Sequence, residues 1–371
     1  MKKKIGIFFP LSGRLLNFDN RYFVKEPKEF YYGIDFIFKS YKTEYDLKFI
    51  DSRAKPDKLL HIFLVYLNRF VNRFTNFKFS MSRVEIAKKE ILKNDVLISF
   101  TDSGSLSIGT LASSLKKRPY FIGGFHGLSD CIEDVPFFLR NLYKKMIGQS
   151  LKGLDHIFFF GDADRKKCIK IFGISEKKTS TFRHSVDTNF WSPRKVKLNK
   201  SIFSVGSDPR RDYETLIKSQ KVYQVKILTK LNLKNLILPS HISVIQGSFH
   251  EKGISNIQLR DLYNSATIVV VPIKNVLQPS GYSVTMQALA CGRPVILPAF
   301  RGLWDKESFK HMENCILYKP EDPKDLGEKI NLIMQDKVLQ KKISRNARKL
   351  ALEVFNLQRT NNDLLNLIKM Y

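Results

Sequence analysis

Short runs of β-branched and aromatic residues alternate with longer helical patterns along most of this 371-residue chain. The runs are long enough for buried strands, and the segments between them carry apolar residues at helical spacing. The expected strands are residues 5–9, 47–50, 96–100, 120–122, 156–160, 202–205, 225–229, 242–245, 268–271, 295–297 and 315–318. The expected helices include residues 84–93, 105–115, 164–172, 213–221, 256–263, 284–290, 324–334 and 338–351. Strands that alternate with helices predict parallel sheets of the α/β class.

The alternation forms two series, which predicts two doubly wound, Rossmann-like domains. A break at residues 187–200, where Pro193 lies among basic residues, separates the two series. We therefore expect one domain over residues 1–190 and another over residues 200–354, with a helix at 355–371 that packs back on the first domain. Ligands of open parallel sheets bind beyond the carboxyl ends of the strands, so two such domains facing each other predict a cleft.

Residues 271–305 read as strand, loop, helix, turn and strand, and the helix ends at Gly292 and Pro294. The loop that opens into this helix contains Ser280, Gly281, Tyr282 and Ser283. A loop of this kind offers free backbone N–H groups and the positive end of a helix dipole, which suits a diphosphate. Gln287 lies one turn further on, where its amide can reach a ribose or sugar hydroxyl.

The motif Gln287-Ala-Leu-Ala-Cys-Gly292, followed by Pro294 and Val295, resembles the nucleotide-sugar signature of retaining GT-B glycosyltransferases of family 4. The usual form has two glutamates eight positions apart before Ala-Met-Ala-Cys-Gly. Here Gln287 replaces the second glutamate and Pro279 stands at the first. The resemblance implies the GT-B fold, with two Rossmann-like domains facing across a cleft. It also implies that the C-terminal domain binds the sugar donor and the N-terminal domain lies on the acceptor side.

A second stretch, residues 203–216, resembles the opening of the family's donor domain, with a strand, a glycine turn and basic residues before a helix. Asp212 is expected to cap the helix that Tyr213 begins. Arg210 and Arg211 precede it, and arginine's fixed fork of donors suits phosphate oxygens. The resemblance implies that Arg211 stabilises the leaving diphosphate and that Arg210 helps to bind the donor. A surface arginine pair at a helix start is the alternative.

In the first domain, His126 lies in a Gly-Phe-His-Gly-Leu-Ser context after an expected strand. This context resembles the family's loop that carries a cleft histidine facing the donor sugar, which implies a catalytic role for His126. A histidine at such a loop is otherwise often structural. Gly13, in Pro-Leu-Ser-Gly-Arg, matches the family's glycine turn that lets the backbone approach the donor phosphate.

The formal net charge of +28, from 63 basic and 35 acidic residues, predicts attraction to polyanions such as nucleic acid or anionic lipid. No nucleic-acid-reading motif accompanies the charge, so specific nucleic-acid binding is not expected. Cysteine and histidine spacings give no metal site, and Asp162-Ala-Asp164 precedes a helix, where N-terminal capping explains it. Without paired cysteine spacing or a signal-like apolar run, a cytoplasmic protein is expected.

These observations predict a glycosyltransferase that moves a sugar from a nucleoside-diphosphate sugar to an acceptor hydroxyl, without a metal or other cofactor. Retention of the anomeric configuration is implied by the resemblance alone. So is a role in envelope polysaccharide, lipopolysaccharide or glycolipid synthesis, with a lipid-linked or glycan acceptor. The alternatives are a non-catalytic polyanion- or nucleic-acid-binding protein on a GT-B scaffold, and a GT-B epimerase or phosphorylase.

Residues 58–83 carry five basic residues and no acidic one, with apolar residues at helical spacing. Such a basic amphipathic helix can lie in a membrane interface, drawn by anionic lipid. Arg69, Phe70, Arg73 and Phe74 are the predicted membrane-docking residues, which would place the enzyme peripherally on the cytosolic face. A core-facing helix with a solvated basic face is the alternative.

Overall fold

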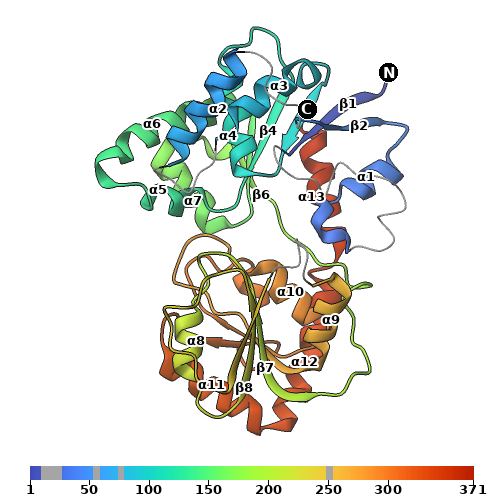
Figure 1. The fold of residues 1–371 in the computed structure, drawn as a ribbon. Helices are drawn as coiled ribbons and strands as arrows, with labels where there is room; N and C mark the ends of the chain where they lie inside the picture. Colours follow the sequence, from blue (N-terminus) through green and yellow to red (C-terminus); the bar gives the residue numbers. More distant parts are fainter. Residues whose placement is uncertain (10–26, 53–58, 74–78, 248–253) are drawn as a thin grey trace. The chain divides into compact units, whose positions relative to one another are not determined.

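The computed structural model describes residues 1–9, 27–52, 59–73, 79–247 and 254–371 (Figure 1). The chain divides into two compact units. The first unit comprises Met1–Val24, Tyr31–Arg183 and Asn361–Tyr371, and the second comprises Lys25–Phe30 and His184–Thr360. The division therefore falls at 183/184, slightly before the break at residues 187–200.

The first unit is built on a parallel sheet with the strand order β2-β1-β3-β4-β5-β6. Its strands are β1 (Lys3–Phe8), β2 (Tyr45–Ile50), β3 (Val96–Ser99), β4 (Tyr120–Phe125), β5 (His156–Phe159) and β6 (Thr179–Thr181). Its helices are α1 (Ile34–Ser40), α2 (Leu59–Asn72), α3 (Met81–Ile91), α4 (Asp102–Ala112), α5 (Leu128–Glu133), α6 (Phe137–Gly153), α7 (Asp162–Phe172), η3 (Glu176–Lys178) and most of α13 (Leu357–Lys369). Strand β1 lies between β2 and β3. The chain therefore adds β2 on one side of β1 and then crosses over to add β3 on the other side.

Alternate residues of the first sheet point into two separate apolar clusters, one on each face. Leu97 and Phe121 enter the cluster that α3, α4 and α6 cover. Ile98 and Ile122 enter the other, which contains α13 residues such as Leu364. The C-terminal helix α13, red in Figure 1, consequently lies beside the blue strands of the chain's beginning.

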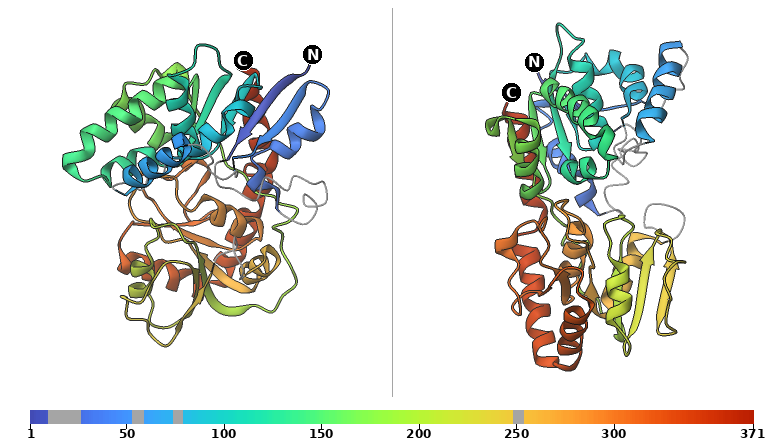
Figure 2. Two further views of the ribbon diagram at one scale, coloured as in Figure 1. Left: turned by 45° about the horizontal axis from the view of Figure 1, so that its top comes forward. Right: turned by 90° about the vertical axis from the view of Figure 1, so that its left-hand side faces the viewer.

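The second unit repeats this plan with the strand order β12-β11-β10-β7-β8-β9. Its strands are β7 (Asn199–Val205), β8 (Gln224–Thr229), β9 (Ile242–Gln246), β10 (Ala266–Val270), β11 (Val295–Pro298) and β12 (Ile316–Tyr318). Its helices are η2 (Lys28–Tyr31, all but its last residue), α8 (Tyr213–Ser219), α9 (Asn256–Ser265), α10 (Tyr282–Ala290), η4 (Lys306–Ser308), α11 (Pro323–Gln335) and α12 (Lys337–Glu353). Helices α11 and α12 run side by side along this unit (Figure 2).

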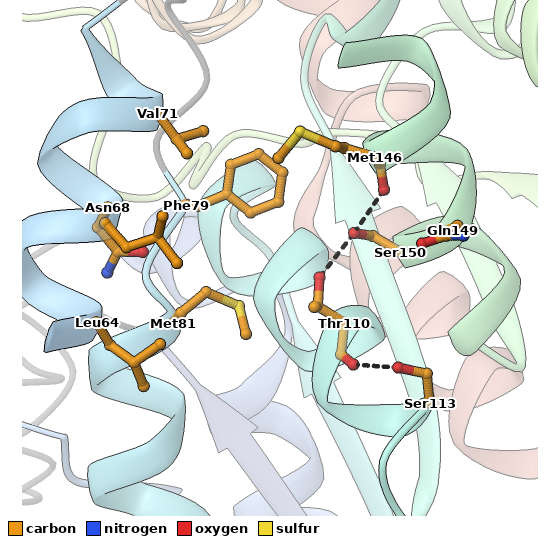
Figure 3. Close-up of a pocket in the computed structure, with 11 residues that line it drawn as sticks. Leu64, Asn68, Val71, Phe79, Met81, Thr110, Ser113, Met146, Gln149 and Ser150 are labelled. Carbon is orange, nitrogen blue, oxygen red and sulfur yellow. Dashed lines mark hydrogen bonds between the residues drawn. The ribbon is translucent and has the colours of Figure 1, made fainter. Parts of the chain in front are cut away.

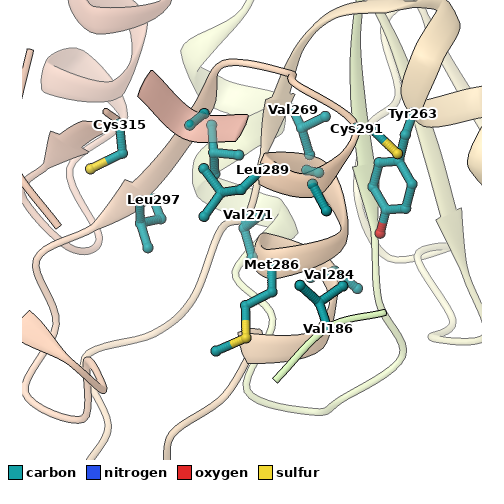
Figure 4. Close-up of a cluster of buried hydrophobic side chains, with 14 of the residues drawn as sticks. Val186, Tyr263, Val269, Val271, Val284, Met286, Leu289, Cys291, Leu297 and Cys315 are labelled. Carbon is teal, nitrogen blue, oxygen red and sulfur yellow. The ribbon is translucent and has the colours of Figure 1, made fainter. Parts of the chain in front are cut away.

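The core of the second unit also has one cluster on each face of the sheet. Helix α10 lies deep in one of them, because the residues from Val284 to Ala290 are all buried. Figure 4 shows Met286 and Leu289 of this helix among strand residues such as Val269 and Leu297. Most of these residues are apolar, which suits such a position.

The order β10-β7-β8 contains a switch point. From β7 the chain builds outward to β8 and β9, and it then returns to β10 on the other side of β7. The loops after β7 and β10 therefore leave the same edge of the sheet as neighbours, which is where open α/β sheets bind their ligands.

Every strand expected from the sequence is present, with ends shifted by a few residues. β6, α1, α5 and α6 were not predicted. β6 consists of Thr179, Ser180 and Thr181, without an apolar residue, and α6 is interrupted in its pattern by Gly148 and several basic residues.

The helix expected within residues 58–83 is shorter than its pattern suggests. α2 ends at Asn72, whose side chain accepts from Phe79 N (2.8 Å) and donates to Phe79 O (3.1 Å). These two bonds compete with continuation of the helix. In the described part of the chain, no helix combines the length and apolar character that crossing a membrane needs.

Candidate active site

The loops after β7 and β10 are joined by backbone contacts in the second unit. Arg211 and Ile273 form an isolated antiparallel bridge, and Lys274 N donates to Arg210 O at 3.0 Å. Asp212 caps α8 as predicted, since its side chain accepts from Thr215 N at 3.1 Å. These backbone bonds hold the loop after β7, which carries Arg210 and Arg211, against the loop after β10, which carries Ser280 and Gly281. The two loops meet at the switch point of the sheet.

The side chain of Arg211 lies inside this junction rather than on the surface, with 6% of the residue exposed. A Cβ added at Gly206 would lie 2.3 Å from Arg211 Nε, and one added at Gly281 would lie 3.2 Å from its Nη1. Only glycine at position 206 leaves room for the guanidinium. The alternative of a surface arginine pair does not fit Arg211, while Arg210 is half-buried beside it.

Two guanidinium nitrogens of Arg211, Nε and Nη1, are buried without a hydrogen-bond partner among the described residues. A buried charged donor without a partner is costly, so such groups normally serve an anion or another ligand. The guanidinium also lies against Gly281, the residue directly before α10. A cation and a helix N-terminus therefore meet at one place, which suits a phosphate.

Asp208 holds the Ser/Gly loop in position. Its Oδ2 accepts from Ser280 Oγ at 2.6 Å and from Gln278 Nε2 at 3.3 Å. Its Oδ1 accepts from the backbone N–H of Arg210 at 2.9 Å. One carboxylate thus links both loops, which fixes the distance between Ser280 and the arginines.

The backbone at the start of α10 has a conformation that lets a ligand approach it closely. Gly281 has φ 79°, a left-handed conformation that favours glycine. Ser283 Oγ lies 3.3 Å from His184 Nε2, and the Tyr282 ring lies 4.2 Å from the His184 ring. Tyr282 and Ser283 therefore pack against a histidine of their own unit.

Gln287 is buried, and both ends of its amide have protein partners. Its Oε1 accepts from Tyr263 Oη and its Nε2 donates to Glu29 Oε1, each at 3.1 Å. The same Glu29 oxygen accepts from Trp191 Nε1 at 2.6 Å, and Glu29 Oε2 accepts from Asp187 N at 3.2 Å. The amide predicted to meet a ribose is thus part of an internal network.

Burial raises the pKa of Glu29 from 4.5 to about 7, against the lowering effect of its hydrogen bonds from Gln287 and Trp191. Loss of hydration disfavours the carboxylate, and the nearby Asp187 acts in the same direction. Cys291, in the same motif as Gln287, is also buried, and desolvation raises its pKa to about 12. A thiol in that state is a packing residue rather than a nucleophile.

In the first unit, His126 directly follows β4 and meets the start of α4. Asp102 Oδ2 lies 3.2 Å from His126 Nδ1, and Asp102 Oδ1 accepts from His126 N at 3.1 Å. The His126 ring also stacks on Phe160, with the ring centres 4.1 Å apart. The aspartate orients the ring and favours a proton on Nδ1, so Nε2 is the nitrogen left to face a substrate.

The Asp162-Ala-Asp164 pair is not simply the cap of its own helix, as the sequence suggested. Asp162 forms ion pairs with Arg165 and Lys166. Asp164 instead caps α5, because it accepts from Leu128 N at 3.1 Å and Ser129 N at 2.8 Å. Both carboxylates therefore have partners in the first unit.

Most apolar residues of the predicted membrane helix α2 are exposed, while Leu64, Val65 and Val71 are half-buried. Phe63 is 61% exposed and Phe70 is 65% exposed, whereas the buried residues of the helix are His61 and Asn68. Arg69 is exposed as well. The exposed side chains favour the membrane-docking prediction over a core-facing apolar stripe. Arg73 is also exposed, while Gly13 and Phe74 lie outside the described residues.

Among the residues of these networks that were not predicted from the sequence are Glu29, Asp102 and Asp208. Asp102 and Asp208 each follow the end of a strand, and that position was their signal. Glu29 had no signal, because its partners Trp191 and Gln287 lie more than 150 residues away along the chain.

Known proteins resemble this chain in sequence and in fold. Residues 233–350 match the family Glycosyl transferases group 1, a stretch that includes Ser280, Gly281 and Gln287. This part of the chain is therefore a group 1 glycosyltransferase domain, and the protein is an enzyme of the glycosyltransferase class.

A curated relative is the N,N'-diacetylbacillosaminyl-diphospho-undecaprenol alpha-1,3-N-acetylgalactosaminyltransferase of Campylobacter jejuni. It is 23% identical over 298 residues, which cover 71% of this chain and 75% of the relative.

Among solved structures, Anabaena HepE in complex with UDP-glucose aligns with a TM-score of 0.70 and 16% identity, over 99% of this chain and 100% of that one. Sucrose-phosphate synthase from Thermosynechococcus elongatus aligns with a TM-score of 0.69 and 14% identity, over 100% of this chain and 99% of the other. These likenesses confirm the expected GT-B fold.

Proposed function

We propose that this glycosyltransferase moves a sugar from a nucleoside-diphosphate donor to an acceptor hydroxyl, with Arg211 binding the donor's diphosphate. The observation that carries the proposal is the buried guanidinium of Arg211. Its Nε and Nη1 have no partner among the described residues, and it lies against Gly281 at the start of α10. Charge that builds on a departing diphosphate needs a preorganised cation and N–H donors at such a place.

The proposed reaction is retaining, as in the family 4 enzymes that the sequence resembles. The acceptor oxygen attacks the anomeric carbon on the face from which the diphosphate leaves. A phosphate oxygen of the leaving group takes the acceptor proton, so the protein needs no strong base. His126, whose ring Asp102 orients, presents Nε2 to a donor-sugar hydroxyl and accepts a hydrogen bond from it.

The proposed reaction needs no metal ion and no other cofactor. The Asp162-Ala-Asp164 pair supports this, because Asp162 pairs with two basic residues and Asp164 caps α5. Their oxygens are committed to these partners. Neutralisation of the diphosphate is assigned to Arg211 and Arg210 instead.

The acceptor that we propose is lipid-linked, so that the enzyme works peripherally on the cytosolic leaflet in envelope-glycan or lipopolysaccharide-type synthesis. Phe63, Phe70 and Arg69 on the exposed face of α2 support binding to anionic lipid. The name of the Campylobacter relative, which describes a diphospho-undecaprenol acceptor, points the same way.

The test is incubation of the protein with a panel of nucleoside-diphosphate sugars, beginning with UDP-glucose, in the presence of anionic vesicles with and without lipid-linked acceptors. Release of free nucleotide and heat stabilisation by the donor are measured. We expect one donor class to stabilise the protein and to be turned over faster with acceptor present. Binding of polyanions without stabilisation by any donor would instead favour a non-catalytic scaffold.

A further inference from the structure

An apolar pocket of about 210 Å³ lies in the first unit between α2, α4 and α6. Figure 3 shows its two sides, with Leu64 and Val71 of α2 facing Met146 of α6. Phe79 and Met81, at the start of α3, complete the apolar lining. The pocket is larger than the cavity of roughly 150 Å³ that takes up benzene in another protein.

Apart from Gln149, which is exposed, the polar side chains that line the pocket are hydrogen-bonded within the protein. Thr110 Oγ1 and Ser150 Oγ bond to each other at 2.7 Å, and Ser113 Oγ donates to Thr110 O at 2.8 Å. Asn68 Nδ2 donates to Ser82 Oγ at 3.2 Å. Because these groups already have partners, the pocket suits an apolar ligand rather than a polar one.

One wall of the pocket is fixed by direct backbone contact between α4 and α6. A Cβ added at Gly109 would lie 2.1 Å from Ser150 O, and one added at Gly153 would lie 2.0 Å from Gly109 O. Two helices that touch at their backbones leave no room for this wall to move inward. The pocket is therefore a built feature of the packing of α4 and α6.

The two outer helices carry the largest exposed apolar side chains around this pocket. Besides Phe63 and Phe70 of α2, Phe137 is 82% exposed and Phe138 is 70% exposed at the start of α6. Neither α2 nor α6 contains an acidic residue. The exposed basic residues on them or directly after them are Arg69, Arg73, Lys145 and Lys152.

We infer that this pocket takes up one acyl chain of an anionic membrane phospholipid, whose headgroup is held by the basic residues of α2 and α6. The exposed aromatic side chains lie at the interface, the pocket receives the chain, and the surplus positive charge meets the phosphate. The inference rests on the proposed membrane binding for the source of the lipid and adds a defined lipid site to it.

A second copy of the chain does not fit the same surface. Helices α2 and α6 carry basic residues and no acidic one, so two copies of them repel each other, whereas an anionic amphiphile complements both their charge and the apolar lining. Charge complementarity thus selects a lipid as the occupant.

A short-chain phospholipid that stays in solution distinguishes binding to the pocket from binding to a bilayer surface. Dihexanoyl phosphatidylglycerol, used below its micelle concentration, is titrated into the full protein by calorimetry, with glycerophosphoglycerol as the headgroup control. We expect saturable binding of the lipid and none of the headgroup alone. Absence of lipid binding, together with normal sedimentation on anionic vesicles, overturns the pocket and leaves the membrane proposal standing. Absence of both overturns the two together.

Two neighbouring serines provide a matched pair of variants. Ser113 lines the pocket and Ser114 does not, and both are exposed at the end of α4, where a larger side chain is tolerated. Ser113→Trp is expected to weaken lipid binding at least about tenfold, because each methylene group kept from an apolar site costs roughly fourfold in affinity. Ser114→Trp is expected to change it less than about twofold. Equal effects of the two variants overturn the assignment.

A photoreactive phospholipid locates the chain directly. Vesicles that contain phosphatidylglycerol with a diazirine on one acyl chain are irradiated with the protein, and labelled residues are identified by mass spectrometry. Labels on Leu64, Val71 or Met146 support the pocket. Labels confined to Phe63, Phe70 and Phe138 overturn it, because the chain would then lie on the outer surface only.

Discussion

Gln287 Nε2 donates a hydrogen bond to Glu29 Oε1 at 3.1 Å, although the two residues are 258 positions apart in the chain. The sequence motif has a glutamate at this position in its usual form. A glutamine here supplies an N–H to a buried carboxyl group that a second carboxylate could not supply. The presence of Glu29 therefore gives a physical reason for Gln287.

Gln287→Glu is consequently expected to lower the stability of the second unit by about 2 kcal/mol or more, because it places two acceptor groups together in a buried site. Differential scanning calorimetry at pH 7.5 measures this loss. The double variant Glu29→Gln with Gln287→Glu restores one donor to the pair and should recover at least half of the loss. A Gln287→Glu protein as stable as wild type would contradict the network.

The pH dependence of stability tests the state of Glu29. Its pKa in the folded protein is about 7 against 4.5 ordinarily, so the unfolded chain loses this proton first as pH rises. The contribution of Glu29 to the free energy of unfolding is therefore largest below about pH 4.5. It is lost as the pH rises to 7, and the loss is roughly 3 kcal/mol at most. Asp164, whose pKa burial raises to about 6, contributes with the same sign.

Glu29→Gln should remove the Glu29 part of this dependence while Asp164 retains its own. Thermal unfolding from pH 4.5 to 8 is compared between wild type and the variant. The variant should gain stability relative to wild type as pH rises to 7 and no further above it. A difference that stays constant over the whole range would mean that Glu29 titrates normally.

His126 and Asp102 are expected to act as one unit in turnover. His126→Ala should lower kcat by about tenfold or more, and Asp102→Asn should lower it less, because Asp102 positions the ring without touching the substrate. In the double variant the two losses should not add. The measurement is steady-state kinetics with the donor found in the panel. Additive losses in kcat, or an effect on KM alone, would contradict this pairing.

The exposed face of α2 is expected to carry membrane binding. Arg69→Gln, Phe70→Ser and Arg73→Gln together should abolish sedimentation with anionic vesicles, and wild-type binding should weaken with salt. The matched control removes one exposed apolar and two exposed basic residues from α12, through Val338→Ser, Lys341→Gln and Lys342→Gln. Equal loss in both variants would assign the binding to net charge alone.

The fold could be predicted because most of its strands are short buried runs of β-branched and aromatic residues, which local sequence determines. Asp212 as the cap of α8 was predictable for the same reason, since capping involves residues three apart. The burial of Gln287 was not, because it depends on Glu29 and Trp191 from distant segments. Nor does periodicity tell which face of a helix meets the core, so α2 needed a structure to show its apolar face outside.

The most direct test asks whether the buried guanidinium of Arg211 binds the donor's diphosphate. Calorimetric titration compares a nucleoside diphosphate with its monophosphate, for each common base, in wild type, Arg211→Ala and the exposed control Lys218→Ala. We predict that wild type and Lys218→Ala bind one diphosphate at least about tenfold tighter than its monophosphate, and that Arg211→Ala loses this preference while remaining folded. A preference for the diphosphate that survives in Arg211→Ala, or no binding of any nucleoside diphosphate by wild type, would contradict the account.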